Sequence, residues 1–280
     1  MPPTISGREA YRVPFRSLAP FLLISFGLAW GILGLFIFLQ EPMEAVFGHL
    51  TGNHPLFFLA VYAPAIAAFT LVAHNGGLAG LRCFLGRALL WRCSVAWYAF
   101  LIIGIPLVFI SGSAIRGNLL TEPFPFASFR ALLVALVLAV VKGPVEEFGW
   151  RGLALPLLQR KFAPIWAGLI LGAIWGLWHL PAFLLSGTQQ SEWSFTTFLA
   201  GCLAISVIAT ALFNRSHGSI LLTGFFHFSL MNPIFPDAQP YDTCLLIIVA
   251  TLVVWWSRKE MFTKEMSVTE VIPHGNVADG

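Results

Sequence analysis

Eight long apolar runs, separated by short polar connections, make up most of this chain. A helix needs about 20 mostly apolar residues to cross the hydrocarbon core of a bilayer, and each run meets or approaches that length. The pattern therefore predicts an all-α integral membrane protein with about eight transmembrane helices. We expect them over residues 17–39, 55–74, 94–113, 131–156, 163–186, 194–213, 219–234 and 241–256.

The runs follow one another without a repeat, a low-complexity block or a long hydrophilic linker. We therefore expect residues 1–256 to form a single polytopic membrane domain, followed by a polar, loose cytoplasmic tail over 257–280. The first run is too long for the core of a signal peptide, and no small-residue cleavage site follows it. We expect it to stay in the mature protein.

The charges in the connections predict how the chain is oriented. Lys and Arg accumulate in cytoplasmic loops, and here they alternate from one connection to the next. One side carries Arg8, Arg12, Arg16, Arg82, Arg87, Arg92, Arg160, Lys161, Arg215, Arg258, Lys259 and Lys264. The other side carries or borders Glu41, Glu44, Glu122, Glu192, Asp237 and Asp242, and it also carries Arg116. Both termini are therefore expected in the cytoplasm, which requires an even number of spans.

Composition supports the membrane assignment and removes several classes of protein. Of the 280 residues, 58% are apolar or aromatic and 10% are charged, whereas soluble domains average roughly 45–50% and about 25%. The mean hydropathy is +0.81, so a water-soluble enzyme is excluded. The net charge of +3 does not indicate a nucleic-acid partner, and the four cysteines lack the spacing of a zinc site or a disulfide framework.

The fourth run is not purely apolar, because it contains Lys142, Glu146, Glu147 and Arg151 within ten residues. A charged group near the bilayer centre costs at least about 2.5–3.5 kcal/mol, so such residues usually mark a buried functional site. Glu147 and Arg151 are four apart and are expected to pair. Lys142 and Glu146 have the same spacing, but Pro144 disturbs the turn between them. Glu146 is therefore the carboxylate that we expect to be available for chemistry.

Two further runs carry polar side chains that are expected to face inward. The fifth run has Trp175 and His179 on one helical face, and the seventh has His227 and Asn232. Small residues at a spacing of four let helices approach closely, and the fifth run has them at Gly168, Gly172 and Gly176.

These motifs resemble those of the CPBP intramembrane proteases, the family named for CAAX prenyl proteases and bacteriocin-processing proteins. The family pattern is EExxxR, then FxxxH, then HxxxN. Here the resemblance covers about residues 142–233 and consists of Glu146-Glu147-xxx-Arg151, Trp175-xxx-His179, and His227 followed by Asn232.

The resemblance implies a glutamic endopeptidase with a water-filled catalytic cavity inside the membrane. It assigns water activation to Glu146 and His179, and stabilisation of the oxyanion to His227 and Asn232. Glu147 and Arg151 take a supporting role. No metal or other cofactor is implied. The implied substrate is a membrane-associated peptide or protein, with a prenylated CAAX tail, a bacteriocin leader, a membrane peptide and a regulatory protein as the candidates.

The chain departs from the family pattern at two positions. Trp175 stands where the family has phenylalanine, and we expect this change to affect packing only. Asn232 lies five positions after His227 instead of four, with Met231 in the expected place. Because Pro233 disfavours helical geometry at the residue before it, we expect local unwinding to re-aim the Asn232 amide.

The depth of the site sets a condition on the fourth span. If that span ended at 148, Glu146 would lie near the inner surface, while His179 would lie far across the bilayer. Extending the helix through Leu157 brings the two residues to similar depths. The catalytic interpretation therefore predicts a long fourth helix.

Three other functions stay open at this point. Glu146, His179 and His227 offer a nitrogen and oxygen donor set for a zinc-dependent hydrolase. Carboxylates and histidines in spans also build the proton relays of transporters. A noncatalytic immunity or assembly protein on the same scaffold is the third alternative. The sequence gives no oligomeric state, and the compact chain favours a multi-pass protein of a prokaryotic plasma membrane.

Overall fold

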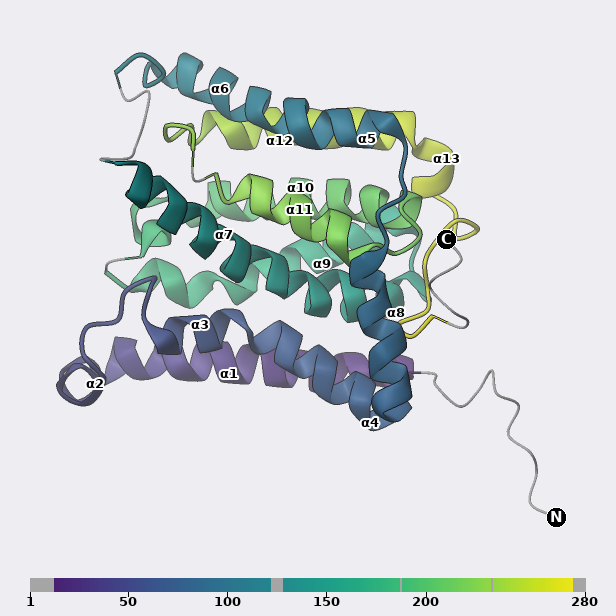
Figure 1. Cartoon of the computed structure of the whole chain (residues 1–280), viewed down its shortest axis with the longest axis horizontal. Helices are drawn as coiled ribbons and strands as arrows, with labels where there is room; N and C mark the ends of the chain where they lie inside the picture. The colour runs from purple at the N-terminus through teal and green to yellow at the C-terminus, as the bar shows by residue number, and fades with distance from the viewer. Residues whose placement is uncertain (1–12, 122–127, 187, 233, 274–280) are drawn as a thin grey trace.

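The computed structural model describes residues 13–121, 128–186, 188–232 and 234–273. Within these ranges the chain is helical and has no β-strand, which confirms the predicted all-α fold (Figure 1). The α-helices are α1 (Leu18–Phe38), α2 (Gln40–Phe47), α3 (Pro55–Val61), α4 (Ala63–Gly86), α5 (Val95–Ala99), α6 (Ile105–Arg116), α7 (Phe129–Gly149), α8 (Leu155–Gln159), α9 (Pro164–Trp178), α10 (Phe195–Arg215), α11 (Ile220–Leu230), α12 (Tyr241–Trp256) and α13 (Arg258–Met261).

Single turns of 3₁₀- or π-helix extend or join these helices. They are η1 (Phe15–Ser17), η2 (Arg87–Leu89), η3 (Phe100–Gly104), η4 (Trp150–Ala154), η5 (Leu180–Leu184) and η6 (Gln189–Glu192). The π-turn η4 makes α7 and α8 one continuous helical segment that ends at Gln159. The long fourth helix required by the catalytic interpretation is therefore present.

Five helical segments of the described chain are long and apolar enough to cross a membrane. They are Phe15–Phe38, Ala63–Leu89, Val95–Arg116, Pro164–Leu184 and Phe195–Arg215. The remaining three predicted spans correspond to the charged segment of α7 to α8 and to two shorter apolar helices, α11 and α12. The protein is thus an all-α membrane protein.

The second predicted span, 55–74, differs from the structure. After α3, helix α4 continues to Gly86, with a kink at Gly77, where φ is 58°. Glycine adopts positive φ without a steric penalty, so the chain turns there and resumes its helix. The extra turns bury Phe84, which packs against Phe69 and Phe148.

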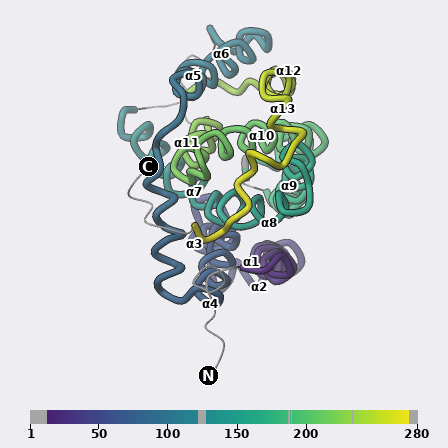
Figure 2. Tube along the Cα trace, turned by 90° about the vertical axis from the view of Figure 1, so that its right-hand side faces the viewer, coloured from purple at the N-terminus to yellow at the C-terminus, as the bar shows by residue number. Residues whose placement is uncertain are grey.

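The helices form three groups that lie side by side. Figure 2 shows α7 to α11 in the middle, with α1 to α4 on one side and α5, α6 and α12 on the other. In Figure 1, α2 lies at one end of the bundle and both α8 and α13 lie at the opposite end. The connection that holds α2 therefore lies at the opposite end from those near α8 and α13.

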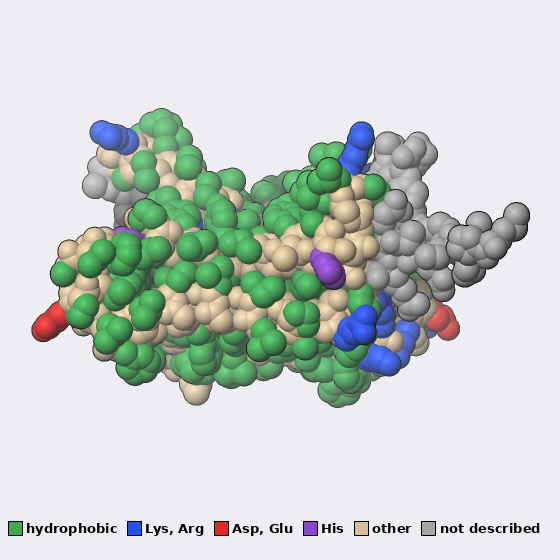
Figure 3. Space-filling model, turned by 90° about the horizontal axis from the view of Figure 1, so that it is seen from below, with side chains coloured by type: hydrophobic (Ala, Val, Ile, Leu, Met, Phe, Trp, Pro, Cys, Tyr) green, Lys and Arg blue, Asp and Glu red, His purple; other side chains and the backbone are tan. Residues whose placement is uncertain are grey.

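The outer surface suits a lipid environment. Large apolar side chains such as Leu23, Phe38 and Val95 are mostly exposed, at 74%, 83% and 82%. In Figure 3 the visible face is largely hydrophobic, and most of its Lys and Arg side chains gather toward one end.

The glycines of the fifth run form a close packing surface, as predicted, and α10 is the helix that fills it. A Cβ atom at Gly172 would lie 2.9 Å from the Cys202 carbonyl oxygen, and one at Gly168 would lie 2.8 Å from Thr210 Oγ1. Helix α9 is thereby fixed against α10, and its C-terminal end carries His179.

The expectation of a loose tail is wrong for residues 257–273. Val271 and Ile272 are 1% and 3% exposed and join the hydrophobic core. The tail backbone is held by side chains of the bundle: Gln159 Nε2 donates to the Val268 carbonyl at 2.9 Å, and Arg87 donates to that of Glu270. Burial of the two apolar side chains and these hydrogen bonds order the segment. The rest of the tail, 274–280, lies outside the described residues, as do Arg8, Arg12 and Glu122 of the charge pattern.

Candidate active site

Three helices bring the polar residues of the motifs together. Helix α7 starts at a Ser128 cap, whose hydroxyl accepts from the Ala131 amide at 3.2 Å, and α11 starts at a similar Ser219 cap. Helix α7 lies close to α11 at Gly143, where a Cβ would be 2.9 Å from the His227 ring. A larger residue there would push the two helices apart.

Glu146 is buried, and one of its oxygens is held by two tryptophans. The indole Nε1 of Trp175 donates to Glu146 Oε2 at 2.9 Å, and that of Trp150 donates to the same oxygen at 3.2 Å. Glu146 is 5% exposed. The expectation that Trp175 affects packing only is therefore wrong, because its N–H bonds the carboxylate.

Trp150 is a site residue that sequence reasoning missed. It lies four residues after Glu146 on the same helix and is 0% exposed. A signal was available, since side chains at a spacing of four meet on one helical face and an indole N–H needs an acceptor when it is buried.

Glu147 links α7 to α11. Its Oε1 accepts from Arg151 Nη1 at 2.9 Å and from His227 Nδ1 at 2.8 Å. The predicted pair of Glu147 with Arg151 is confirmed, and both side chains are 1% exposed. The Arg151 guanidinium also lies 5.2 Å from the ring centroid of Trp175. The Glu147 carboxylate is thus part of a buried network of hydrogen bonds with Arg151 and His227, whereas Glu146 contacts two tryptophans.

His179 stands at the end of α9 inside a set of aromatic rings. Its Nδ1 lies 2.8 Å from the carbonyl oxygen of Trp175. A carbonyl only accepts hydrogen bonds, so we assign the proton to Nδ1, which leaves a lone pair on Nε2. The rings of Trp175, Trp178 and Phe198 lie within 5.3 Å, 4.8 Å and 5.1 Å of the imidazole centroid.

Lys142 does not pair with Glu146. Its Nζ donates to Asn53 Oδ1 at 2.9 Å and lies 5.0 Å from the ring centroid of Phe58. The amide and the aromatic face stabilise the ammonium group, so the carboxylate of Glu146 is not neutralised by it.

Asn232 lies beyond the end of α11, in the left-handed region with φ at 42°. Its Oδ1 accepts from the Phe235 amide at 2.9 Å, and its Nδ2 donates to the Phe235 carbonyl at 3.2 Å. The expected departure from helical geometry at this position is confirmed, while Pro233 lies outside the described residues. One Nδ2 proton of the amide is used in the turn and a second is left over.

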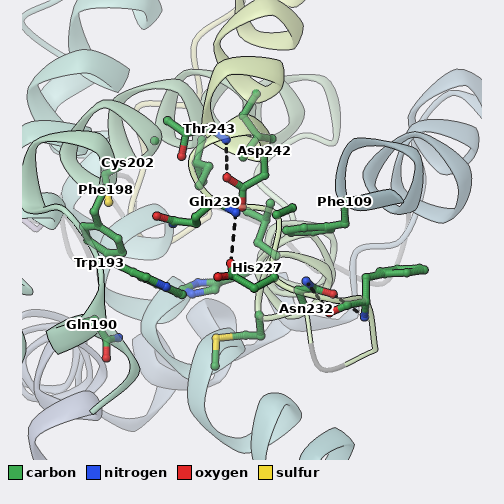
Figure 4. A pocket seen from close by; sticks show the side chains of 18 of the residues that line it. Phe109, Gln190, Trp193, Phe198, Cys202, His227, Asn232, Gln239, Asp242 and Thr243 are labelled. Atoms are coloured by element: carbon green, nitrogen blue, oxygen red, sulfur yellow. Dashed lines mark hydrogen bonds between the residues drawn. The ribbon is translucent and has the colours of Figure 1, made fainter. Parts of the chain in front are cut away.

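Two cavities meet at the site. The larger, of about 510 Å³, is lined by Phe109, Trp193 and Phe198 and extends past Asn232 to Asp242 (Figure 4). The smaller, of about 170 Å³, is lined by Lys142 and Glu146. His179, His227, Met231 and Gln190 line both. The motif histidines therefore stand between a large space with a mixed polar and apolar lining and a small one that contains the carboxylate.

A zinc site would require Glu146, His179 and His227 to be grouped around one ion. In the described parts of the chain, no three His, Cys, Asp or Glu side chains are grouped so that they could hold a metal ion. Glu146 faces two indoles, and His227 is turned toward Glu147.

Comparison with known proteins gives a family match to this region and one similar relative. Residues 128–232 match the family model described as type II CAAX prenyl endopeptidase Rce1-like. Over 178 residues the chain is 28% identical to CAAX prenyl protease 2 from Methanococcus maripaludis, an alignment that covers 59% of this chain and 65% of the relative. The chain thus spans slightly less than two thirds of that relative. The family-model match includes all six of the motif positions expected to form the site.

Proposed function

We propose that this chain, which belongs to the CPBP family of membrane proteases, is an intramembrane glutamic-type endopeptidase. The observation that carries the proposal is the meeting of Glu146, His179 and His227 where two cavities join. The three side chains come from α7, from the end of α9 and from α11, so they are brought together only by the packing of these helices.

In the proposed reaction, a water molecule is bound between Glu146 and His179. Glu146 takes one proton from this water, while the free Nε2 of His179 accepts a hydrogen bond from the other O–H. The oxygen attacks the carbonyl carbon of the scissile peptide and forms the C–O bond, while the π electrons of the C=O bond move to the carbonyl oxygen. When the C–N bond breaks, the proton held by Glu146 goes to the leaving nitrogen.

The oxyanion of the tetrahedral intermediate is stabilised by His227 and Asn232. The Nδ1 edge of the His227 ring is held by Glu147, and its Nε2 edge is the one proposed to face the oxyanion. Asn232 contributes its remaining amide proton. Glu147 and Arg151 support the site by fixing the His227 ring.

The substrate is proposed to be a membrane-associated peptide or protein. The larger cavity is lined by aromatic rings such as Trp193 and Phe198 together with polar groups such as Asp242, and it is the proposed site for the substrate. A prenylated tail is the first candidate, since the relative's name is CAAX prenyl protease 2. We also propose a single membrane domain over 1–256, with both termini in the cytoplasm of a prokaryotic cell.

The test uses the full chain in proteoliposomes with an internally quenched farnesylated CAAX peptide and, separately, with a membrane peptide extract. Mass spectrometry identifies the products, and Glu146→Gln is the matched control, because glutamine keeps the shape of the side chain. We expect cleavage by the wild type alone. Equal cleavage by Glu146→Gln would refute the role of Glu146, and products from neither mixture would favour the noncatalytic alternative.

A further inference from the structure

Two tryptophans hold Glu146, and both donate to the same oxygen. Trp175 Nε1 lies 2.9 Å and Trp150 Nε1 lies 3.2 Å from Oε2. The other oxygen, Oε1, has no hydrogen-bond partner among the described residues and is not sealed from the cavity space. The two oxygens of one carboxylate therefore have different surroundings.

The chemistry of the indole decides what each oxygen can do. An indole N–H is a donor only and cannot accept a proton or a hydrogen bond. Oε2 must therefore be an acceptor toward both rings, and a proton placed on it would face two N–H groups. Oε1 has no such neighbour, so it is the oxygen on which a transferred proton can reside.

Both rings are held rigidly by their packing. The Trp150 ring contacts those of Phe21 and Trp178 edge to face, with centroids 5.4 Å and 5.7 Å away. The Trp175 ring lies against His179 and His227, at 5.3 Å and 5.4 Å. Donors that cannot move keep the carboxylate in one orientation before the substrate arrives.

We propose that Trp150 and Trp175 are positioning residues that fix Glu146 so that Oε1 is its reactive oxygen. The inference rests on the proposed function, in which Glu146 removes a proton from water. In this step the O–H bond of water breaks, the proton goes to Oε1, and the oxygen forms the bond to the carbonyl carbon. The resembled family has phenylalanine at position 175, so this chain has a donor that the motif lacks.

The first test is Trp175→Phe, which keeps an aromatic ring and removes the N–H. A hydrogen bond to a charged group contributes more free energy than one between neutral groups. Losing the bond from Trp175 to the Glu146 carboxylate should therefore lower kcat roughly tenfold to a hundredfold. KM for the quenched farnesylated peptide should change by less than about twofold, because the step affected is proton transfer and not substrate binding. Trp150→Phe should act the same way, and the double variant should be slower than either.

A matched control tests whether the effect of removing an indole N–H is specific to the tryptophans that contact Glu146. The Trp30 indole donates to the Trp178 carbonyl at 3.0 Å and lines neither cavity. Trp30→Phe removes a hydrogen bond of similar length and should keep kcat near the wild-type value.

The decisive variant replaces Trp175 with 3-benzothienylalanine, in which sulfur stands for the N–H and the ring size is kept. We expect its kcat to fall as far as in Trp175→Phe. If this variant is as active as the wild type while Trp175→Phe is slow, ring packing is what matters and the proposal is overturned. If Glu146→Gln itself cleaves normally, the proposed function fails, and the positioning role fails with it.

Discussion

Substitution of Glu147 by glutamine should destabilise the protein far more than the same substitution at Glu146. Glu147 Oε1 is the shared acceptor of Arg151 and His227, and all three groups are buried. Glutamine keeps the shape and one acceptor oxygen but removes the negative charge. The Arg151 guanidinium would then be a buried cation without a counter-charge.

The structure sets the size of the effect. Glu147 and Arg151 are each 1% exposed, so water does not screen the lost charge. Breaking a buried ion pair by removing one partner typically costs about 3–5 kcal/mol. Since 1 kcal/mol shifts Tm by about 2–4 °C in chains of this size class, Tm should fall by at least about 6 °C. Glu146→Gln should spare the fold, because its amide oxygen still accepts from both indoles.

The assay is a thermal melt of the detergent-purified variants, with the folded yield read from size-exclusion chromatography. Glu192→Gln is the matched control, because Glu192 is exposed and such surface changes are usually within about 0.5 kcal/mol. Adding Arg151→Met to Glu147→Gln removes the orphaned cation and should recover part of the lost stability.

The outcome that would refute this reasoning is specific. If Glu147→Gln has the same Tm as Glu192→Gln, the buried Arg151 cation is not stabilised by the Glu147 carboxylate. If Glu147→Gln is also fully stable but inactive while Glu146→Gln is active, the roles of the two carboxylates are reversed.

Three further predictions concern mechanism and topology. Glu146→Gln and His179→Ala should each abolish most hydrolysis, and the double variant should be little slower, because groups that activate one water are non-additive; multiplied losses would contradict this. Asn232→Ala and Asn232→Gly should each lower kcat at least about tenfold, and since glycine tolerates the positive φ, normal turnover by the glycine variant would reject the oxyanion role. Cysteines at positions 41 and 92, now Glu41 and Arg92, should be labelled from opposite sides of the membrane, and labelling from one side would refute the alternation.

The local features of the site could be predicted from the sequence. The Glu147–Arg151 pair is set by a spacing of four on one helix, and the close packing of α9 follows from its glycines. Both depend only on the geometry of a single helix and could be read from the chain.

Apart from the contact of Trp150 with Glu146, four residues away, the missed features join residues far apart in the chain. Glu147 meets His227 across 80 positions, and Lys142 meets Asn53 across 89. These contacts depend on which helices are neighbours, and helical periodicity does not contain that information. The role of Trp175 was missed for a related reason, because its acceptor, Glu146, lies on another helix.

The ordered tail bears on how this protein is completed during synthesis. Arg87, near the end of α4, is 2% exposed and donates to the Glu270 carbonyl, 183 positions later. Chains fold from the N-terminus as they are made, so this guanidinium cannot bind that carbonyl until 183 further residues have been synthesised. In a chain that stops within the last helices, the Arg87 guanidinium would lack this acceptor at one end of the bundle. Fusions placed before residue 273 should therefore be recovered in poorer folded yield than fusions placed after it.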